Sequence, residues 1–397
     1  MNQYKSLLDT EIQCTCGGIH YVPIKEINLD FQIEDILCIC KTYFLGKNIL
    51  IVGDEHTRVQ INDKIIEVMR NSDYNISVVQ FKDKKLVPDE KAVGSILMAT
   101  PRDIHGIISI GSGTINDLNR LIGDRLKIPV ITIATAPSMD GYAAAGSSLM
   151  FQGAKKTIKG SPVTVIVGNI DVIKDCPYEL IQAGFGDIIG KKTAIADWSL
   201  SKHLTGEYWC NMAVDLVIES TELCISNVDS IAKRDKNAIK QLTEALVLSG
   251  IAMSIVDDTR PASGGEHLIS HYMVMKAIGS GNNPPSHGKT VAIGTLITTI
   301  LYYFLFDSIA FNKIENHNRI QIDIMKYLPT VEDVRCWLNS IQLPDHPRAY
   351  DITETFMREI ILNAGFIRER YTIFSLLHQL DILHEAAEYM AHFFYHE

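Results

Sequence analysis

The sequence predicts a two-domain protein: an N-terminal α/β domain of the doubly wound, Rossmann-like type, followed by an all-helical C-terminal domain. From residue 48 onward, short β-branched runs alternate with stretches of helical length. After Pro177 the strand signal ends and long amphipathic stretches follow. With 397 residues, the chain is long enough to form two hydrophobic cores. We expect the α/β domain to span residues 1–176 and the helical domain residues 177–397.

Four apolar segments are the expected strands of one parallel sheet. They are NILIVG (48–53), NISVVQF (75–81), GIISIG (106–111) and PVITIA (129–134). Because the runs are apolar rather than alternating, helices must cover both faces of the sheet. A helical segment reaching about Arg70 separates the first two strands. The stretch 147–168, in which polar turns surround a β-branched run, is expected to form a hairpin leading to the second domain.

Amphipathic periodicity predicts helices over residues 236–256 and 368–394 of the second domain. The longest apolar run, Val291 to Phe306, has sixteen residues and is interrupted by Gly294 and Thr295. A helix that spans a membrane needs about 20 apolar residues. We therefore expect this run to be a buried core helix and predict no membrane insertion.

The net charge and the cysteine content indicate which kinds of molecule the protein can bind and in which cellular compartment it is expected. The formal net charge of -10 argues against nucleic acid, because binding it requires neutralising many phosphates. A small anionic substrate is not excluded, since its site needs only local positive charge. The eight cysteines are too scattered for a disulfide framework, and the first residues show no signal peptide. We expect a cytoplasmic protein.

The segment CTCGGIH allows two interpretations. Cys14, Cys16 and His20 are possible ligands of a second metal. Only three such residues lie close together in sequence, and no matching cluster follows downstream. We therefore favour an N-terminal strand or hairpin that carries reduced thiols.

A glycine-rich turn follows the strand GIISI and leads into a helix. Gly111 and Gly113 in GSGTINDLNRL allow a tight turn and close approach to an anion, and the helix N-terminus favours phosphate. The motif is shorter than the full dinucleotide fingerprint, so a plain turn remains the alternative. Asp54, at the end of the first strand of this sheet, is placed either to accept from a ribose hydroxyl or to cap a helix.

The segment TIATAPSMDGYAAAG follows the end of another strand. Ligands of parallel sheets bind at the carboxyl ends of the strands. Thr135 and Ser138 are candidates to contact a cofactor, and Asp140 is a candidate to accept from a substrate hydroxyl. Taken singly, each is also a common turn or capping residue.

Two histidines lie four positions apart in GGEHLISHYMVM. On a helix, His267 and His271 face the same way. His287 begins the next buried helix and Asp187 lies near the start of the helical domain. Two imidazoles and one carboxylate leave coordination positions open, as a catalytic metal site requires. The alternative is that the histidines are ordinary core residues with satisfied hydrogen bonds.

Five ordered motifs together resemble a known family. They are GSGTIND, TAPSMDGYAA, GFGDIIGKKTAIADW, GGEHLISH and SHGKTVAIGTL. The sequence resembles the sn-glycerol-1-phosphate dehydrogenase family, in particular its bacterial AraM-type branch, from about residue 45 to at least residue 310. That family is related to glycerol dehydrogenase, iron-containing alcohol dehydrogenases and dehydroquinate synthase. The resemblance implies the dehydroquinate synthase-like fold.

The resemblance also implies roles for individual residues. Asp187, His267 and His287 match the metal ligands of this family, His271 matches a residue beside the substrate, and Asp140 matches a substrate-contacting aspartate. Asp187, Asp140 and His271 are thus the expected catalytic residues. The expected cofactor-binding residues are Asp54, Gly111, Gly113, Thr114, Ile115, Asn116, Asp117, Thr135 and Ser138. Related sequences often have a serine where this chain has Ala144, so one cofactor hydrogen bond is either missing or supplied by Ser147 or water.

The activity implied by the resemblance is the reversible reduction of dihydroxyacetone phosphate to sn-glycerol 1-phosphate, with NAD or NADP and one divalent metal ion. Nickel is the expected metal and zinc the alternative, and a homodimer is expected. Two other functions remain: a glycerol dehydrogenase of the same superfamily, and a sensor that binds nucleotide and metal without turnover. The sensor is disfavoured because all five metal-binding and substrate-contacting residues are present. Candidate cations for the substrate phosphate are Lys155, Lys156, Lys159, Lys191, Lys192 and Lys289.

Overall fold

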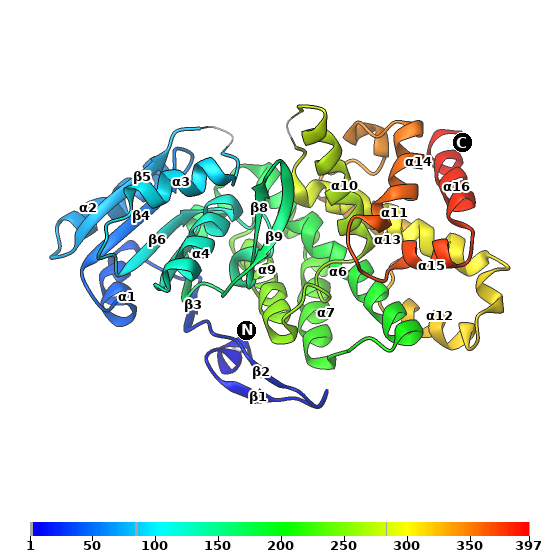
Figure 1. The fold of residues 1–397 in the computed structure, drawn as a ribbon, viewed down its shortest axis with the longest axis horizontal. Helices are drawn as coiled ribbons and strands as arrows, with labels where there is room; N and C mark the ends of the chain where they lie inside the picture. Colours follow the sequence, from blue (N-terminus) through cyan, green and yellow to red (C-terminus); the bar gives the residue numbers. More distant parts are fainter. Residues whose placement is uncertain (1–2, 84–85, 283, 397) are drawn as a thin grey trace. The chain divides into compact units, whose positions relative to one another are not determined.

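The computed structural model describes residues 3–83, 86–282 and 284–396 (Figure 1). The chain forms two compact units. Unit 1 comprises residues 1–181 and 234–257, and unit 2 comprises residues 182–233 and 258–397. Unit 1 is built on a parallel sheet and unit 2 on helices, which confirms the predicted fold class.

Unit 1 contains a six-stranded parallel sheet in the order β3-β10-β7-β6-β4-β5. Its strands are β3 (Glu26–Asn28), β4 (Asn48–Asp54), β5 (Asn75–Phe81), β6 (Gly106–Gly111), β7 (Val130–Ala134) and β10 (Val165–Gly168). The four strands expected from the apolar runs are β4, β5, β6 and β7, so each of these runs is a strand of the sheet.

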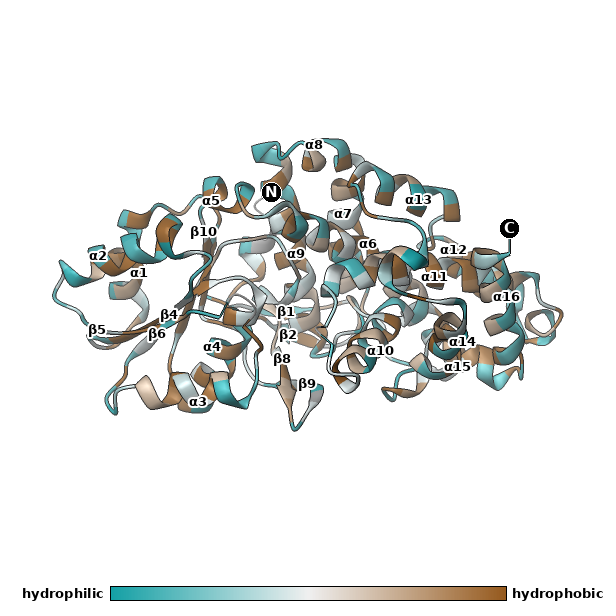
Figure 2. Cartoon of the chain, turned by 90° about the horizontal axis from the view of Figure 1, so that it is seen from above, coloured by the Kyte–Doolittle hydropathy of each residue, from teal (hydrophilic) through white to brown (hydrophobic). Residues whose placement is uncertain are grey.

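Helices cover both faces of this sheet, as the continuous apolar strands require. One layer holds α1 (Ile36–Tyr43), α2 (Asp63–Arg70) and α5 (Ile170–Lys174), and the other holds α3 (Glu90–Ala99) and α4 (Gly113–Leu126) (Figure 2). Alternate strand residues such as Ile49, Ile51 and Ile108 join α1 and α2 in one buried core. The α/β unit is therefore a three-layer structure.

The strands that lie beyond β7 in the sheet differ from those expected from the sequence. Residues 147–168 do contain a hairpin, β8 (Gly146–Phe151) with β9 (Ala154–Lys159). The β-branched run that follows is not part of that hairpin, because β10 lies between β7 and β3 in the main sheet. All four residues of β10 are buried, which explains their apolar character. β3 was not expected, since its three residues are too few to give a pattern.

Helix α9 (Lys236–Val256) belongs to unit 1, although the sequence analysis assigned its residues to the second domain. It packs against α5, β2 (Ile19–Tyr21) and the short helix η4 (Gly141–Ala143). Two hydroxyls of α9 hold the loop that contains η4: Ser249 Oγ donates to Asp140 Oδ2 at 2.9 Å, and Ser254 Oγ donates to the Ala143 carbonyl at 2.9 Å. The helix thus supports a loop that carries a candidate site residue.

Every regular element in the described part of unit 2 is helical. The longer helices are α6 (Tyr178–Thr205, which begins in unit 1), α7 (Asn211–Ser226), α10 (Gly265–Gly279), α11 (His287–Asp307), α12 (His317–Met325), α13 (Val331–Ser340), α14 (Glu354–Asn363), α15 (Ile373–Gln379) and α16 (Leu383–Tyr395). Residues 368–394 form two helices rather than one, because Asp381 has a left-handed backbone with φ 59°.

Helix α11 is the expected core helix. By length and composition, both α11 and α9 are apolar enough to cross a membrane. However, 83% of the apolar window of α11 and 67% of that of α9 are buried inside the protein. Burial of this kind explains their hydrophobicity, because a core helix is apolar around most of its circumference.

Candidate functional site

Three helices of unit 2 bring one carboxylate and two imidazoles together. Asp187 lies on α6, His267 on α10 and His287 at the start of α11. One ligand atom from each side chain lies within 4.8 Å of the other two. His267 Nε2 is 3.5 Å from Asp187 Oδ1. The carboxylate and His267 are buried, and His287 is partly exposed.

Glycines on α11 allow the backbones of these helices to approach closely. A Cβ atom on Gly288 would lie 1.8 Å from the carbonyl oxygen of Ala183 on α6. A Cβ atom on Gly294 would lie 2.6 Å from the carbonyl oxygen of Glu266 on α10. Only glycine is compatible with such contacts, which are far below van der Waals separation. The short interhelical distance places the three candidate ligands side by side.

A buried carboxylate orients the ring of His267. Glu266 Oε1 lies 2.7 Å from His267 Nδ1. Burial alone would raise the pKa of Glu266, but its hydrogen bonds to His267, the Gly264 amide and the Thr193 hydroxyl outweigh burial and lower it. An ionised carboxylate only accepts hydrogen bonds, so Nδ1 carries the proton. Nε2 is then the ring atom that faces Asp187, and it can bind a metal in place of a proton.

A series of hydroxyls orients the ring of His287 in the same way. Thr290 Oγ1 lies 2.8 Å from the His287 carbonyl and uses its single proton there. Ser270 Oγ, 2.6 Å from Thr290 Oγ1, must therefore donate to it. Ser270 Oγ is left as an acceptor for His287 Nδ1 at 3.3 Å. This arrangement favours the tautomer of His287 in which Nδ1 carries the proton, and Nε2 is then left as the ligand atom.

Lys191 holds the third candidate ligand. Its ammonium group is fully buried and donates to Asp187 Oδ1 at 2.8 Å and to the Ala262 carbonyl at 3.2 Å. Burial acts to raise the pKa of Asp187, but the Lys191 ammonium and the two imidazoles outweigh burial and hold this pKa well below its ordinary value. Asp187 is therefore a carboxylate fixed in position by a cation.

These residues fit a divalent metal ion. Two imidazole nitrogens and one carboxylate oxygen converge. Each of these donors is also held in position by a hydrogen bond to a buried neighbour, as metal ligands in proteins usually are. His271 is close but is not one of the three convergent residues: its ring centroid lies 5.9 Å from that of His267 and 5.7 Å from that of His287. The two histidines of the motif thus have different surroundings on the same helix.

The hydroxyl series makes a testable prediction about metal affinity. Ser270→Ala should weaken metal binding about 10–100-fold, because His287 loses the acceptor that fixes its ring and tautomer. Competition with a chromophoric chelator measures the dissociation constant. Thr290→Ser is the matched control, since it keeps the hydroxyl and should bind metal as the parent does. Equal affinity in Ser270→Ala would contradict the assigned role.

The glycine-rich turn lies at the switch point of the sheet in unit 1. β4 has β5 on one side and β6 on the other, so the chain direction across the sheet reverses between β4 and β6. Ligands of open α/β sheets bind outside the strand ends at such a point. β6 ends at Gly111 and α4 begins at Gly113, while β4 ends at Asp54. A Cβ atom on Gly113 would lie 2.7 Å from Met139 Cε, so a larger residue here would have to displace the flexible Met139 side chain.

Several expected cofactor residues already have partners within unit 1. Asp54 Oδ1 accepts from the amides of His56 and Thr57, as a capping residue does. Asn116 accepts from Thr132 Oγ1 at 2.8 Å, and its amide donates to the Gly141 carbonyl. Asp117 pairs with Arg120. Asp54 thus holds the turn after β4, whereas Asn116 contacts the loop that contains η4 and Asp117 pairs within α4.

The remaining members of the set are placed as follows. Ile115 is buried against Gly111, Thr114 is half-buried in the first turn of α4, and Thr135 is buried directly after β7. Ser138 is half-buried in the following loop. Ser147 is buried and accepts from Arg120 Nε at 3.2 Å, so this hydroxyl supports the loop.

Three of the candidate phosphate-binding lysines are engaged elsewhere. Besides Lys191, Lys192 pairs with Glu222 at 2.5 Å and Lys159 with Asp257 at 2.5 Å. Lys156 lies over the Phe151 ring, 5.1 Å from its centroid. Among the residues that the sequence analysis did not select, Glu266, Ser270 and Thr290 support the metal centre.

Comparison with known proteins identifies the relatives of the chain. Residues 36–177 match the family described as iron-containing alcohol dehydrogenase. The chain is 30% identical to a glycerol-1-phosphate dehydrogenase [NAD(P)+] of Bacillus licheniformis, over 93% of each chain. It is 32% identical to the protein of that name from Bacillus subtilis, over 72% of each chain. A Pyrococcus horikoshii protein of the same name is 32% identical over 68% of this chain and 76% of its own.

Solved structures with the same fold are more distant in sequence. A probable glycerol dehydrogenase from Sinorhizobium meliloti has a TM-score of 0.68 at 14% identity, covering 93% of this chain and 97% of that one. Glycerol dehydrogenase from Schizosaccharomyces pombe has a TM-score of 0.67 at 14% identity, covering 92% and 90%. These similarities establish the dehydrogenase fold. The sequence relatives show that the chain belongs to the glycerol-1-phosphate dehydrogenase family.

Proposed function

We propose that this protein catalyses the NAD(P)H-linked, metal-dependent reduction of dihydroxyacetone phosphate to sn-glycerol 1-phosphate, and the reverse oxidation. The observation that carries the proposal is the convergence of Asp187, His267 and His287 on one point, in a chain whose relatives bear this name. A metal in that position, when bound, supplies a Lewis acid that polarises a ketone oxygen.

The chain's own residues hold the ligands and prepare the site. Glu266 and Ser270 fix the tautomers of the two histidines, and Lys191 fixes the carboxylate of Asp187. A preformed ligand set costs no reorganisation when the substrate binds. Nitrogen and oxygen donors with open positions accept nickel, which we propose as the metal, with zinc as the alternative.

In unit 1 we propose that the turn between β6 and α4 binds the dinucleotide. The amides at the N-terminus of α4 favour a pyrophosphate, and Thr135 and Ser138 lie in the loop after the neighbouring strand. The nicotinamide supplies or accepts the hydride. Both NAD and NADP are to be tested as cofactors.

Two residues are proposed to contact the substrate hydroxyls. His271 is half-buried beside the metal centre and suits proton exchange with the substrate oxygen. Asp140 accepts from Ser249 at 2.9 Å, which fixes the carboxylate that is proposed to orient a hydroxyl. The cytoplasmic location and the homodimer implied by the family resemblance belong to the same proposal.

The activity is tested with purified protein, NADH or NADPH, added nickel or zinc, and dihydroxyacetone phosphate. We expect loss of NAD(P)H absorbance, and chiral analysis should identify the product as the 1-phosphate rather than its mirror image, the 3-phosphate. Oxidation of glycerol and of glycerol 1-phosphate is then compared. Equal rates would indicate a glycerol dehydrogenase, and binding without turnover would indicate a sensor.

A further inference from the structure

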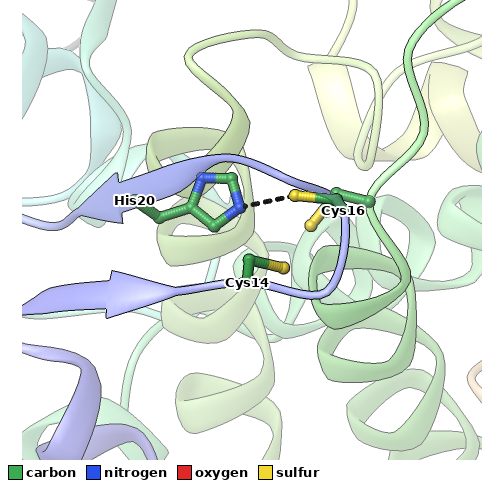
Figure 3. A group of neighbouring side chains, drawn as sticks. Cys14, Cys16 and His20 are labelled. Atoms are coloured by element: carbon green, nitrogen blue, oxygen red, sulfur yellow. Dashed lines mark hydrogen bonds between the residues drawn. The ribbon is translucent and has the colours of Figure 1, made fainter.

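The N-terminal hairpin of unit 1 brings two cysteines and a histidine together. Strands β1 (Glu11–Gln13) and β2 are antiparallel, and residues Cys14 to Gly18 connect them. The Sγ atoms of Cys14 and Cys16 and one ring nitrogen of His20 lie within 4.8 Å of one another. Cys16 Sγ is 3.2 Å from His20 Nε2 (Figure 3). The two cysteines come from the turn and the histidine from β2, and their side chains converge.

The backbone of the turn is shaped around these sulfurs. The Cys14 amide donates to the Gly18 carbonyl at 3.0 Å, and the Gly17 amide donates to the Cys14 carbonyl at 3.0 Å. Gly17 has φ +88°, a conformation that favours glycine. The Gly18 amide lies 3.5 Å from Cys16 Sγ and points its proton at the sulfur. Amide donors of this kind stabilise the negative charge of a metal-bound thiolate.

Burial in the hairpin is the reverse of what an apolar core requires. His20 is only 6% exposed, whereas its neighbours Ile19 and Tyr21 are 61% and 45% exposed. The face turned inward therefore carries the histidine beside the partly buried Ile12, and the face turned to solvent carries Ile19 and Tyr21. With strands of three residues, such a ribbon has little apolar burial to stabilise it. A bound ion would supply the missing interaction.

We infer that Cys14, Cys16 and His20 bind a zinc ion that stabilises the N-terminal hairpin. In a tetrahedral site, zinc lies about 2.3 Å from sulfur and about 2.0–2.1 Å from nitrogen, so its donors are separated by less than 4 Å. The donor atoms need only small side-chain rotations to reach this geometry. A fourth ligand comes from outside the hairpin. Two thiolates and one imidazole suit zinc, and none of the eight cysteines forms a disulfide.

Cobalt substitution separates this site from the centre at Asp187. The full-length protein, purified without a metal-affinity tag, is stripped of metal under reducing conditions and reloaded with Co²⁺. Thiolate ligation gives a sulfur-to-cobalt charge-transfer band in the near ultraviolet, which two imidazoles and a carboxylate cannot produce. We expect the band in the parent and its loss in Cys14→Ser/Cys16→Ser. Cys38→Ser/Cys336→Ser is the matched control, because it removes two exposed thiols, and it should keep the band.

Alkylation of the unmutated protein gives a second readout that does not depend on a variant folding correctly. Stoichiometric Zn²⁺ should slow modification of Cys14 and Cys16 at least about tenfold, as mapped by peptide mass spectrometry. The exposed Cys38 should react at the same rate with and without zinc. Absence of the band in the parent, its persistence in Cys14→Ser/Cys16→Ser, or equal alkylation rates would overturn the inference. So would zinc that a weak chelator removes completely, which would indicate an adventitious ion only.

Discussion

His267→Ala should leave the protein without its bound metal at Asp187 and lower kcat/KM for dihydroxyacetone phosphate about a thousandfold or more. The imidazole of His267 is one of three convergent ligands, and two remaining ligands bind a divalent ion weakly. Polarisation of the carbonyl contributes several kcal/mol to the transition state, and about 4 kcal/mol corresponds to a factor of about a thousand. Metal analysis and steady-state kinetics with NADH measure the two effects.

His271→Ala is the matched control for this change. The same residue type is removed from the same helix, one turn further along, at a side chain that is not among the three convergent ligands. We expect this variant to retain its metal while its turnover falls, because the proposed proton exchange is lost. Retention of metal by His267→Ala, or equal loss of metal in both variants, would refute the assignment of the ligands.

Arg120→Ala should destabilise the α/β unit by about 3–5 kcal/mol, because it leaves a buried carboxylate without its cation. Arg120 is 2% exposed and is paired with Asp117, which is 9% exposed. Burial raises the pKa of Asp117 and lowers that of Arg120, so both charges depend on the pair. The guanidinium also donates to the carbonyls of Gly141 and Gly146. Its loss should therefore loosen the loop that contains Asp140.

Hydrogen exchange of peptides that cover α4 measures the opening free energy in the parent and the variant. Arg125→Ala serves as the control, since Arg125 lies on the same helix but its side chain is 56% exposed. Removing this surface pair with Asp124 should cost less than about 1 kcal/mol. If the two variants were equally stable, the buried pair would not hold the loop. NADH binding, followed by fluorescence, should weaken in Arg120→Ala alone.

The sequence predicted the parts of the fold that depend on long, regular patterns. The strands β4, β6 and β7 are buried over most or all of their length because both faces of the sheet are covered, and their mainly apolar residues reflect that burial. Helix α9 begins and ends at the residues where its amphipathic pattern does. Short edge elements such as β3 carry no such pattern, because three residues contain too few positions to show a period.

Long-range grouping was less accessible to sequence reasoning. Residues 234–257 lie between two segments of unit 2 along the chain, yet they pack with unit 1. An amphipathic pattern shows that a helix has a buried face, but it does not show which core that face joins. The break between α15 and α16 depends on one left-handed residue, Asp381, within an otherwise helical pattern.

In the candidate metal centre, the spacing of His267 and His271 indicated that both lie on one face of a helix. It did not indicate which hydrogen bonds orient the histidine rings. Glu266 precedes His267 directly, and neighbouring residues on a helix do not normally face each other. The contact at 2.7 Å arises because α10 begins at Gly265, so Glu266 lies in the first turn and turns back toward the ring. The roles of Ser270 and Thr290 depend on the packing of α10 against α11, which no local pattern reports.

The two glycine contacts of α11 mean that the width of the metal centre is set by main chain rather than by side chains. A Cβ atom at Gly288 or Gly294 would meet the carbonyl oxygen of the neighbouring helix, and a main-chain carbonyl cannot move aside as a flexible side chain can. We therefore expect ions of different radius to bind with different affinities, because the spacing of the helices that carry the donor atoms is fixed. Attempts to retune the metal preference of this enzyme should alter the donor atoms and leave the spacing between the helices untouched.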